Sequence, residues 1–245
     1  MSITDFKALS FDCYGTLVDW EAGMRAALKP ITDNSARRLG PDEILERHAR
    51  HAIALEQSTP WKLYRDLLPI VYKRLAEELS VPVKWDDCAA YGRSIGKWPI
   101  FSDTIECLQY LKKHYRIVIL SNVDNANFSE TNRLLGTQFD AVITAEDIGA
   151  YKPSHNNFEY MIEHVGSWNI GRHELLHVAC SLFHDVKPAQ DCGLTTCFIN
   201  RRHGMQGSGA TPHPDSHVQA DHSFPSLSAF VDYHKRSLLA VSAQQ

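Results

Sequence analysis

Residues 7–19 read KALSFDCYGTLVD, and this stretch decides the fold. Its first part, Lys7 to Phe11, is short and mostly apolar, as a buried strand is, and it leads directly into the carboxylate of Asp12. Gly15 follows where the chain is expected to turn. In open parallel sheets, ligands bind beyond the carboxyl ends of the strands. We therefore expect Asp12 to lie at a functional site on the edge of a sheet.

The sequence changes character after this loop. From about residue 20 to 93 it is rich in Ala, Leu, Glu and Arg with helical periodicity, most clearly over 41–57 and 61–79. No strand-like run interrupts this stretch of sequence. We predict an inserted, all-helical cap domain over residues 20–99.

The remainder of the chain alternates between strand and helix patterns. Strands are predicted over residues 116–120, 139–144, 174–178 and 195–199, with a last short strand near 218–222 and a helix over 225–235. Strands separated by helices of this length imply a parallel sheet with right-handed crossovers. The fold class is therefore α/β, with a core built from residues 1–19 and 100–245.

Length and composition exclude several classes of function. The chain has 245 residues, of which 44% are hydrophobic and 22% charged, and its net charge is −4. This balance provides no basic field for nucleic acid or an anionic membrane. No apolar run approaches the roughly 20 residues of a spanning helix, and the first residues lack a signal-peptide pattern. We expect a cytoplasmic protein with no nucleic acid partner and no membrane partner.

Cysteine and histidine do not form a metal-binding pattern in the sequence. The six cysteines contain no C-x-x-C pair, and the 13 histidines are scattered. No histidine pair shows the helical H-x-x-x-H spacing with the glutamate that a zinc enzyme needs. The sequence therefore predicts neither a zinc site nor a disulfide framework.

Reactive side chains follow four of the predicted strands. Asp12 comes after the first, Ser121 and Asn122 after the second, Lys152 after the third, and Asp185 shortly after the fourth. Asp12 can attack an electrophile to give an ester, and a lysine can keep that carboxylate ionised. A second acid can position or activate the water that hydrolyses the ester. This set of side chains is typical of a nucleophilic hydrolase.

The segments FDCYGTLVDW, LSN, YKP and SLFHD, in this order, resemble the motifs of the haloacid dehalogenase superfamily. The resemblance implies a Rossmann-like, three-layer core with a helical cap that closes over the site. It also implies that Asp12 is the nucleophile and that Ser121 binds the anionic group of the substrate. Lys152 would be the anchoring cation, and Asp185 the acid of the last motif.

Tyr14 sets this chain apart from most of that superfamily. The phosphatases carry a second Asp two residues after the nucleophile, which protonates the leaving group, and here that position is Tyr14. A halide is a weak base and needs no proton, so the chain looks like the type II, L-2-haloacid dehalogenase branch. The family's phosphatases also hold Mg²⁺ with this region, and the loss of one carboxylate makes such a site poorer. We expect a reaction without metal or other cofactor, with Mg²⁺ only in a phosphatase alternative.

By this resemblance, Asp12 displaces halide from C2 of a 2-haloacid, and water then hydrolyses the ester. Ser121 would hold the substrate carboxylate, while Asn122 and Tyr14 would shape the pocket. Asp185 would activate water or fix Lys152. The partner is thus a small-molecule carboxylate. Homodimers are common in that branch, and the oligomeric state is left open.

Several positions depart from the dehalogenase pattern. Cys180 and Leu182 stand where a Ser and an Asn are expected, and neither Arg47 nor Arg50 matches the halide-binding arginine unambiguously. Asp185 could instead cap the following helix. Two alternatives therefore stay open. One is a phosphatase of the same superfamily acting on a small phosphorylated metabolite, and the other is a catalytically altered protein that keeps only the fold.

Overall fold

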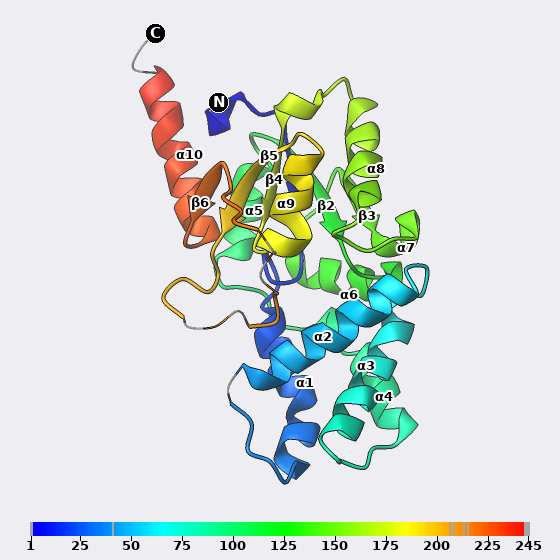
Figure 1. Cartoon of the computed structure of the whole chain (residues 1–245). Helices are drawn as coiled ribbons and strands as arrows, with labels where there is room; N and C mark the ends of the chain where they lie inside the picture. Colours follow the sequence, from blue (N-terminus) through cyan, green and yellow to red (C-terminus); the bar gives the residue numbers. More distant parts are fainter. Residues whose placement is uncertain are drawn as a thin grey trace.

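The computed structural model describes residues 2–40, 42–205, 207, 209–212, 214 and 216–242, and Figure 1 shows the course of the chain. One parallel sheet of six strands runs in the order β3-β2-β1-β4-β5-β6. The strands are β1 (Ala8–Phe11), β2 (Arg116–Ser121), β3 (Ala141–Thr144), β4 (Leu175–Ala179), β5 (Thr195–Ile199) and β6 (His222–Phe224). Phe11 pairs with Ile119 on one side and Val178 on the other, so the central strands end at one common edge.

Alternation along the strands builds a core on each face of the sheet. Leu9 and Phe11 belong to one buried cluster and Ala8 to the other, because successive side chains of a strand point to opposite faces. On the first face pack α5 (Thr104–Leu111), α6 (Asn125–Leu135) and α10 (Leu227–Ser242). On the second pack α8 (His155–Gly166) and α9 (Lys187–Asp191). The predicted α/β class is confirmed, and the core has three layers.

The helical insert between β1 and β2 contains four helices, and α5 follows it before β2. The four are α1 (Trp20–Asn34), α2 (Glu43–Ser58), α3 (Tyr64–Glu78) and α4 (Trp85–Gly92), and they form the lower half of the molecule in Figure 1. Asp19 starts α1 by accepting a hydrogen bond from the backbone N–H of Ala22. The insertion buries its own leucines, among them Leu45 and Leu67. The predicted helical insert is confirmed, while its limits as a domain, residues 20 and 99, stay a prediction.

Shorter elements complete the chain. The short helix α7 (Ala145–Ile148) follows β3, and single 3₁₀ turns occur at Ile3–Asp5, Ile95–Lys97 and Arg172–Glu174. None of the helices within the described ranges is long and apolar enough to cross a membrane.

The last strand lies later than the sequence pattern predicts. We expected it near residues 218–222, but β6 begins at His222. The Asp221 side chain accepts hydrogen bonds from the backbone N–H and the hydroxyl of Thr196, each at 2.8 Å, at the start of β5. This contact fixes where the chain joins the sheet. A tertiary contact of this kind has no counterpart in local hydrophobic periodicity.

Candidate active site

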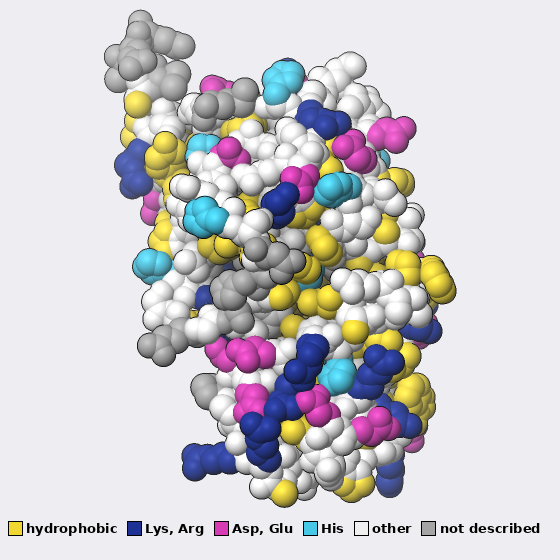
Figure 2. Space-filling model, in the orientation of Figure 1, with side chains coloured by type: hydrophobic (Ala, Val, Ile, Leu, Met, Phe, Trp, Pro, Cys, Tyr) yellow, Lys and Arg dark blue, Asp and Glu magenta, His cyan; other side chains and the backbone are white. Residues whose placement is uncertain are grey.

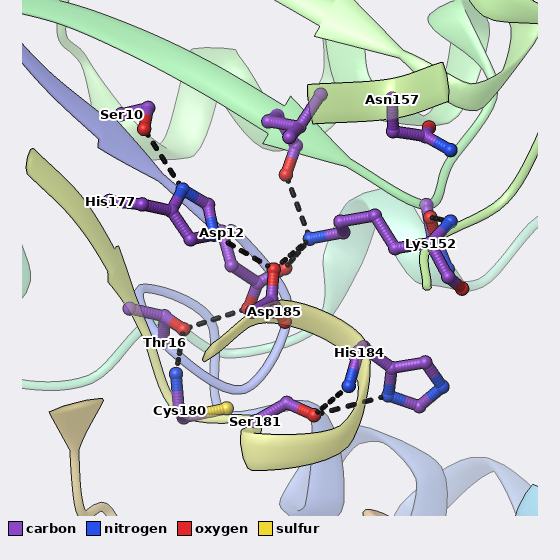
Figure 3. Close-up of polar contacts among 12 residues, drawn as sticks. Ser10, Asp12, Thr16, Lys152, Asn157, His177, Cys180, Ser181, His184 and Asp185 are labelled. Carbon is purple, nitrogen blue, oxygen red and sulfur yellow. Dashed lines mark hydrogen bonds and ion pairs between the residues drawn. The ribbon is translucent and has the colours of Figure 1, made fainter. Parts of the chain in front are cut away.

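Lys152 lies at the centre of the site, as Figure 3 shows. Its Nζ donates to Asp12 Oδ1 at 2.8 Å, to Asp185 Oδ1 at 2.6 Å and to the carbonyl oxygen of Leu120 at 2.9 Å. An ammonium group has three protons, and here each has an acceptor. The side chain is only 2% exposed. The structure thus brings three of the predicted residues into one buried, fully bonded cluster.

Asn122 holds the backbone of that lysine. Its side-chain amide donates to the carbonyl oxygen of Lys152 at 2.9 Å, and its Oδ1 accepts from the backbone N–H of Lys152 at 2.7 Å. These two bonds tie the loop after β3 to the end of β2. Asn122 therefore positions Lys152 as well as bordering the cavity described below.

Thr16 orients the carboxylate of Asp12. The Thr16 hydroxyl donates to Asp12 Oδ2 at 2.7 Å and accepts from the backbone N–H of Cys180 at 2.9 Å. Together with Lys152, it leaves Asp12 with a partner on each oxygen. The sequence analysis missed Thr16, although a hydroxyl four residues after the acid in the same tight loop is a signal that could have identified it.

Asp185 has a second buried partner beneath the site. His177 Nε2 lies 3.1 Å from Asp185 Oδ1, and His177 Nδ1 lies 2.9 Å from the hydroxyl of Ser10. An ionised carboxylate only accepts hydrogen bonds, so Nε2 is the donor in the bond to Asp185. His177 and Ser10 are fully buried on β4 and β1. The sequence analysis missed them because, in a strand, a lone polar residue has the pattern of an ordinary core position.

Asp185 lies within a π-helical turn, Leu182–Val186. The residue that caps this turn is Ser181, whose hydroxyl accepts from the backbone N–H of His184 at 2.8 Å. The alternative that Asp185 serves only as a helix cap is therefore wrong. Single π turns occur frequently at functional sites, where they redirect a side chain.

Burial and partners act in opposite directions on the charges of this cluster. Burial raises the pKa of Asp185, but Lys152 and His177 outweigh it, and the pKa falls to about 2. Burial lowers the pKa of Lys152, yet the two carboxylates raise it above its ordinary value. Burial and the nearby charge of Asp185 raise the pKa of Asp12 above its ordinary value, although Lys152 and Thr16 act against this rise. The bonds to Lys152 and Thr16 favour the ionised form of Asp12 that a nucleophile requires.

A cavity of about 60 Å³ lies against this cluster. The sheet contributes five of the predicted residues to its lining, namely Asp12, Ser121, Asn122, Lys152 and Asp185. Aromatic walls come from Tyr14, Trp20, Tyr64 and Trp98. All six residues predicted from the sequence, Tyr14 included, therefore border one small space at the junction of the sheet and the helical insert. Their individual roles stay predictions.

Tyr14 and Ser121 present different groups to this cavity. The Tyr14 hydroxyl lies 2.7 Å from the hydroxyl of Thr131, and its ring meets that of Trp98 edge-on at 6.2 Å between centroids. Its polar end is thus occupied, and the ring forms a wall. The Ser121 hydroxyl is buried without a hydrogen-bond partner among the described residues. A buried hydroxyl usually has a partner, so this one is suited to a bound ligand.

The cap arginines considered for halide binding lie elsewhere. Arg47 pairs with Glu43 and Glu78, and Arg50 lies 2.9 Å from Glu78. Figure 2 shows side chains of both charges intermixed on this half of the surface. Neither arginine borders the described cavity; the residue of α2 that does so is Glu56.

Glu56 is buried, with 9% of its surface exposed, and burial raises its pKa to about 8. The sequence analysis missed it because a glutamate near the end of an amphipathic helix has the pattern of a surface residue.

The side chains present do not fit a magnesium ion. The two carboxylates that could bind it, Asp12 and Asp185, both contact the ammonium of Lys152, which occupies the position between them. Within the described ranges there is no group of three His, Cys, Asp or Glu side chains arranged for a metal. A divalent ion between these carboxylates would lie directly beside another cation.

Comparison with protein families and curated proteins gives two findings. A family model described as a haloacid dehalogenase-like hydrolase matches residues 6–193. A pyrimidine 5'-nucleotidase of Escherichia coli, YjjG, is 32% identical over 74 residues, which are 30% of this chain. The matched part spans about a third of that relative, 32% of its length.

Solved structures share the fold over nearly the whole chain. An L-2-haloacid dehalogenase from Xanthobacter autotrophicus, with chloropropionic acid covalently bound, has a TM-score of 0.77 and 17% identity, covering 94% of this chain and 98% of that one. A HAD-hydrolase from Bacillus subtilis, YfnB, bound to magnesium, has a TM-score of 0.71 and 19% identity, covering 93% and 97%. At these identities the likeness concerns the fold.

Proposed function

This chain belongs to the haloacid dehalogenase-like hydrolase family, and from that premise we propose that it hydrolyses the carbon–halogen bond of a short 2-haloacid through an ester on Asp12. The observation that carries the proposal is the cavity of about 60 Å³ with Asp12 in its lining and aromatic walls. A cavity that holds benzene measures about 150 Å³, so this space suits a substrate of two or three carbons.

The first step uses the carboxylate of Asp12. One of its oxygens attacks C2 of the substrate, the carbon–halogen bond breaks, and its electron pair leaves with the halide. C2 is inverted and becomes esterified to Asp12. Lys152 and Thr16 hold the carboxylate in place during this attack, which lowers the entropic part of the barrier.

The second step restores the enzyme. Water attacks the carbonyl carbon of the Asp12 ester, and the alkyl oxygen leaves with the product as a 2-hydroxy acid. Lys152 stabilises the negative charge that develops at the carbonyl oxygen. Asp185, held by Lys152 and His177, stays anionic and keeps the lysine charged and in position.

The hydroxyl of Ser121 is the donor we propose for the substrate carboxylate. It ends β2, borders the cavity and has no partner among the described side chains and backbone groups. A bound carboxylate would satisfy this buried hydroxyl and replace part of the hydration that the anion loses.

A phosphatase is the second candidate, because the partial relative is a nucleotidase and one fold neighbour binds magnesium. The small cavity and the ammonium between the carboxylates favour the dehalogenase. Magnesium-dependent cleavage of p-nitrophenyl phosphate that Asp12→Asn abolishes would favour the phosphatase instead.

The deciding experiment measures halide release from L-2-chloropropionate and chloroacetate in the presence of EDTA, with Asp12→Asn as the inactive control. Turnover in water labelled with oxygen-18 should place the label in the carboxyl group of Asp12, because water attacks that carbonyl. Mass spectrometry of the peptide containing Asp12 detects it. Absence of halide release from every short 2-haloacid would exclude the proposed reaction.

A further inference from the structure

Glu56 is the one residue of α2 that borders the catalytic cavity in the described part of the chain. It faces the same space as Asp12 from the opposite half of the molecule, because α2 belongs to the helical insert and Asp12 to the sheet. The residue is more than nine-tenths buried. Among the residues that the structure describes, no hydrogen bond or ion pair engages its carboxyl group.

The charges around Glu56 require it to be neutral when an anion binds. Lys152 is the only Lys or Arg among the described residues that line the cavity, and it already contacts Asp12 and Asp185. An ionised Glu56 would give this small space a third carboxylate against one ammonium. Burial raises the pKa of Glu56 to about 8, and Lys152 only partly opposes this.

Apart from Asp12, whose pKa is raised, the groups with shifted pKa values that face this cavity do not change charge near that pH. Burial lowers the pKa of His184 to about 4, and Asp185 has a pKa of about 2. Burial raises the pKa values of the cavity's tyrosines and cysteine, Tyr14, Tyr64 and Cys180, above their ordinary range, and that of the neighbouring Tyr151 likewise. Lys152 stays charged, and Asp12 is the remaining group, whose ionisation is needed for attack.

We infer that the protonated carboxyl group of Glu56 donates a hydrogen bond to the leaving atom of the substrate, as an acid supplied by the helical insert. This inference rests on the proposed carbon–halogen hydrolysis and adds to it the identity of the group that receives the halide. It also explains why an acidic residue lines a cavity meant for an anion.

The proton balance closes over one turnover. Asp12 forms the bond to C2, the carbon–halogen bond breaks, and its electron pair leaves with the halide ion. The halide accepts a hydrogen bond from Glu56, which keeps its proton because a hydrogen halide is a much stronger acid than this carboxyl group. Water then hydrolyses the ester and gives up one proton in excess of those in the product hydroxy acid. That proton passes to solvent, so no further reagent is required.

This role selects the class of substrate. Bromide and chloride leave without protonation, whereas fluoride is the poorest leaving group of the three and the strongest hydrogen-bond acceptor. A hydrogen-bond donor at the leaving atom therefore matters most for a short 2-fluoroacid. The small cavity also favours the smallest halogen.

The test compares wild type, Glu56→Gln and Glu46→Gln on L-2-fluoro-, L-2-chloro- and L-2-bromopropionate, from about pH 6 to about pH 10. Glu46 is exposed on the same helix and serves as the matched control. In the wild type, kcat/KM should fall above about pH 8, where Glu56 ionises. Glu56→Gln should lose this alkaline fall, because an amide does not titrate there.

The leaving-group dependence separates hydrogen-bond donation from a structural role. Glu56→Gln should reduce turnover of the fluoride substrate about 10²-fold or more, the usual cost of losing a strong donor to developing negative charge, because an amide N–H is a weaker donor than a carboxylic acid. Turnover of the bromide substrate should fall less than about 10-fold. An equal loss on all three substrates with an unchanged alkaline fall would overturn the inference. Glu46→Gln should match the wild type throughout.

Fluoride binding tests the inference even if no 2-haloacid is turned over. Trp20 and Trp98 border the cavity, so their fluorescence reports on an anion within it. Wild type should bind fluoride about 10-fold or more tightly at pH 6.5 than at pH 9.5, and Glu56→Gln should lose this pH dependence. If no halide is released from any 2-haloacid but fluoride binds in this pH-dependent way, the proposed reaction is refuted and the role of Glu56 is supported. If fluoride binding to the wild type does not depend on pH, the role of Glu56 is refuted.

Discussion

The pKa of the buried carboxyl group of Asp185 is lowered at the sheet edge, whereas that of Glu56 is raised in the helical insert. Asp185, at the sheet edge, is held by Lys152 and His177 and has a pKa of about 2. Glu56, on α2, is also buried, but it has no such partners and its pKa is about 8. The two side chains border the same cavity. The partners of a buried carboxyl group, rather than its burial, therefore decide whether it carries a charge or a proton.

A buried histidine of the insert follows the same rule. His48, also on α2, lies 2.7 Å through its Nε2 from the Tyr91 hydroxyl, and no acidic side chain among the described residues pairs with it. Burial lowers its pKa to about 3, so it stays neutral at physiological pH. Its partner is a neutral hydroxyl, whereas His177 at the sheet edge contacts a carboxylate. The insert thus keeps these groups uncharged, while the sheet edge stabilises charge.

The largest effect should come from removing the cation of the sheet edge. Lys152→Met leaves Asp12 and Asp185 buried beside each other without a counter-charge. We expect a loss of stability of about 3–5 kcal/mol and a fall in kcat of more than about 10³-fold. Chemical denaturation and steady-state kinetics measure these. If Lys152→Met were as stable as the wild type, the burial of Asp12 and Asp185 would not depend on this lysine.

The second prediction concerns Glu56, the buried carboxyl group of the helical insert. Between pH 4.5, the ordinary value for glutamate, and about 8, the unfolded chain loses the proton of Glu56 and the folded chain retains it. Wild-type stability should therefore fall as pH rises through this range. At about 1.4 kcal/mol per pKa unit, the upper limit of the fall is about 5 kcal/mol.

Glu56→Gln should remove that contribution. Its stability relative to wild type should rise between pH 5 and pH 8.5, as denaturation curves at several pH values would show, with Glu46→Gln as the reference. A constant difference between the two proteins across this range would mean that Glu56 is already ionised at neutral pH.

A smaller effect is expected from the hydroxyl that orients the nucleophile. Thr16→Val removes one hydrogen bond to Asp12 and leaves the backbone N–H of Cys180 without its acceptor. A hydrogen bond to a charged group contributes about 1.5–3 kcal/mol, so kcat should fall about 10- to 100-fold. Thr16→Ser keeps the hydroxyl and should recover most of the activity. If both variants behave alike, packing rather than the hydrogen bond is responsible.

The smallest effect should follow Tyr14→Phe. The Tyr14 hydroxyl contacts Thr131 rather than the cavity, and the ring remains as a wall beside Trp98. We expect a loss of about 1 kcal/mol in stability and a change of less than about threefold in kcat. A much larger loss of kcat would mean that the hydroxyl turns toward the substrate during the reaction.

The sheet side of the site follows closely from sequence. Asp12 and Ser121 come directly after predicted strands, Lys152 follows the third strand after a short connection, and parallel strands bring their carboxyl ends to one edge. The position of each along the chain therefore fixes its approximate place in space. The structure brings them to one cavity for this reason.

The insert side does not follow in the same way. Which face of α2 meets the sheet depends on how four helices pack over it, and this placed Glu56, rather than Arg47, at the cavity. The buried partner of Asp185, His177, and the Ser10 hydroxyl beside it were equally hidden, because His177 and Ser10 meet across the β1–β4 pairing. Sequence spacing along one segment contains no information about such lateral contacts.

The connection of the helical insert to the sheet has an evolutionary consequence. All four helices of the insert lie between β1 and β2 in the sequence, so the proposed nucleophile and the inferred acid are encoded in separable stretches of one gene. Exchange of that stretch between relatives would replace the residue at the position of Glu56 and leave Asp12, Lys152 and Asp185 unchanged. New leaving-group preferences could thus arise by recombination, without a mutation in the machinery that forms and hydrolyses the ester.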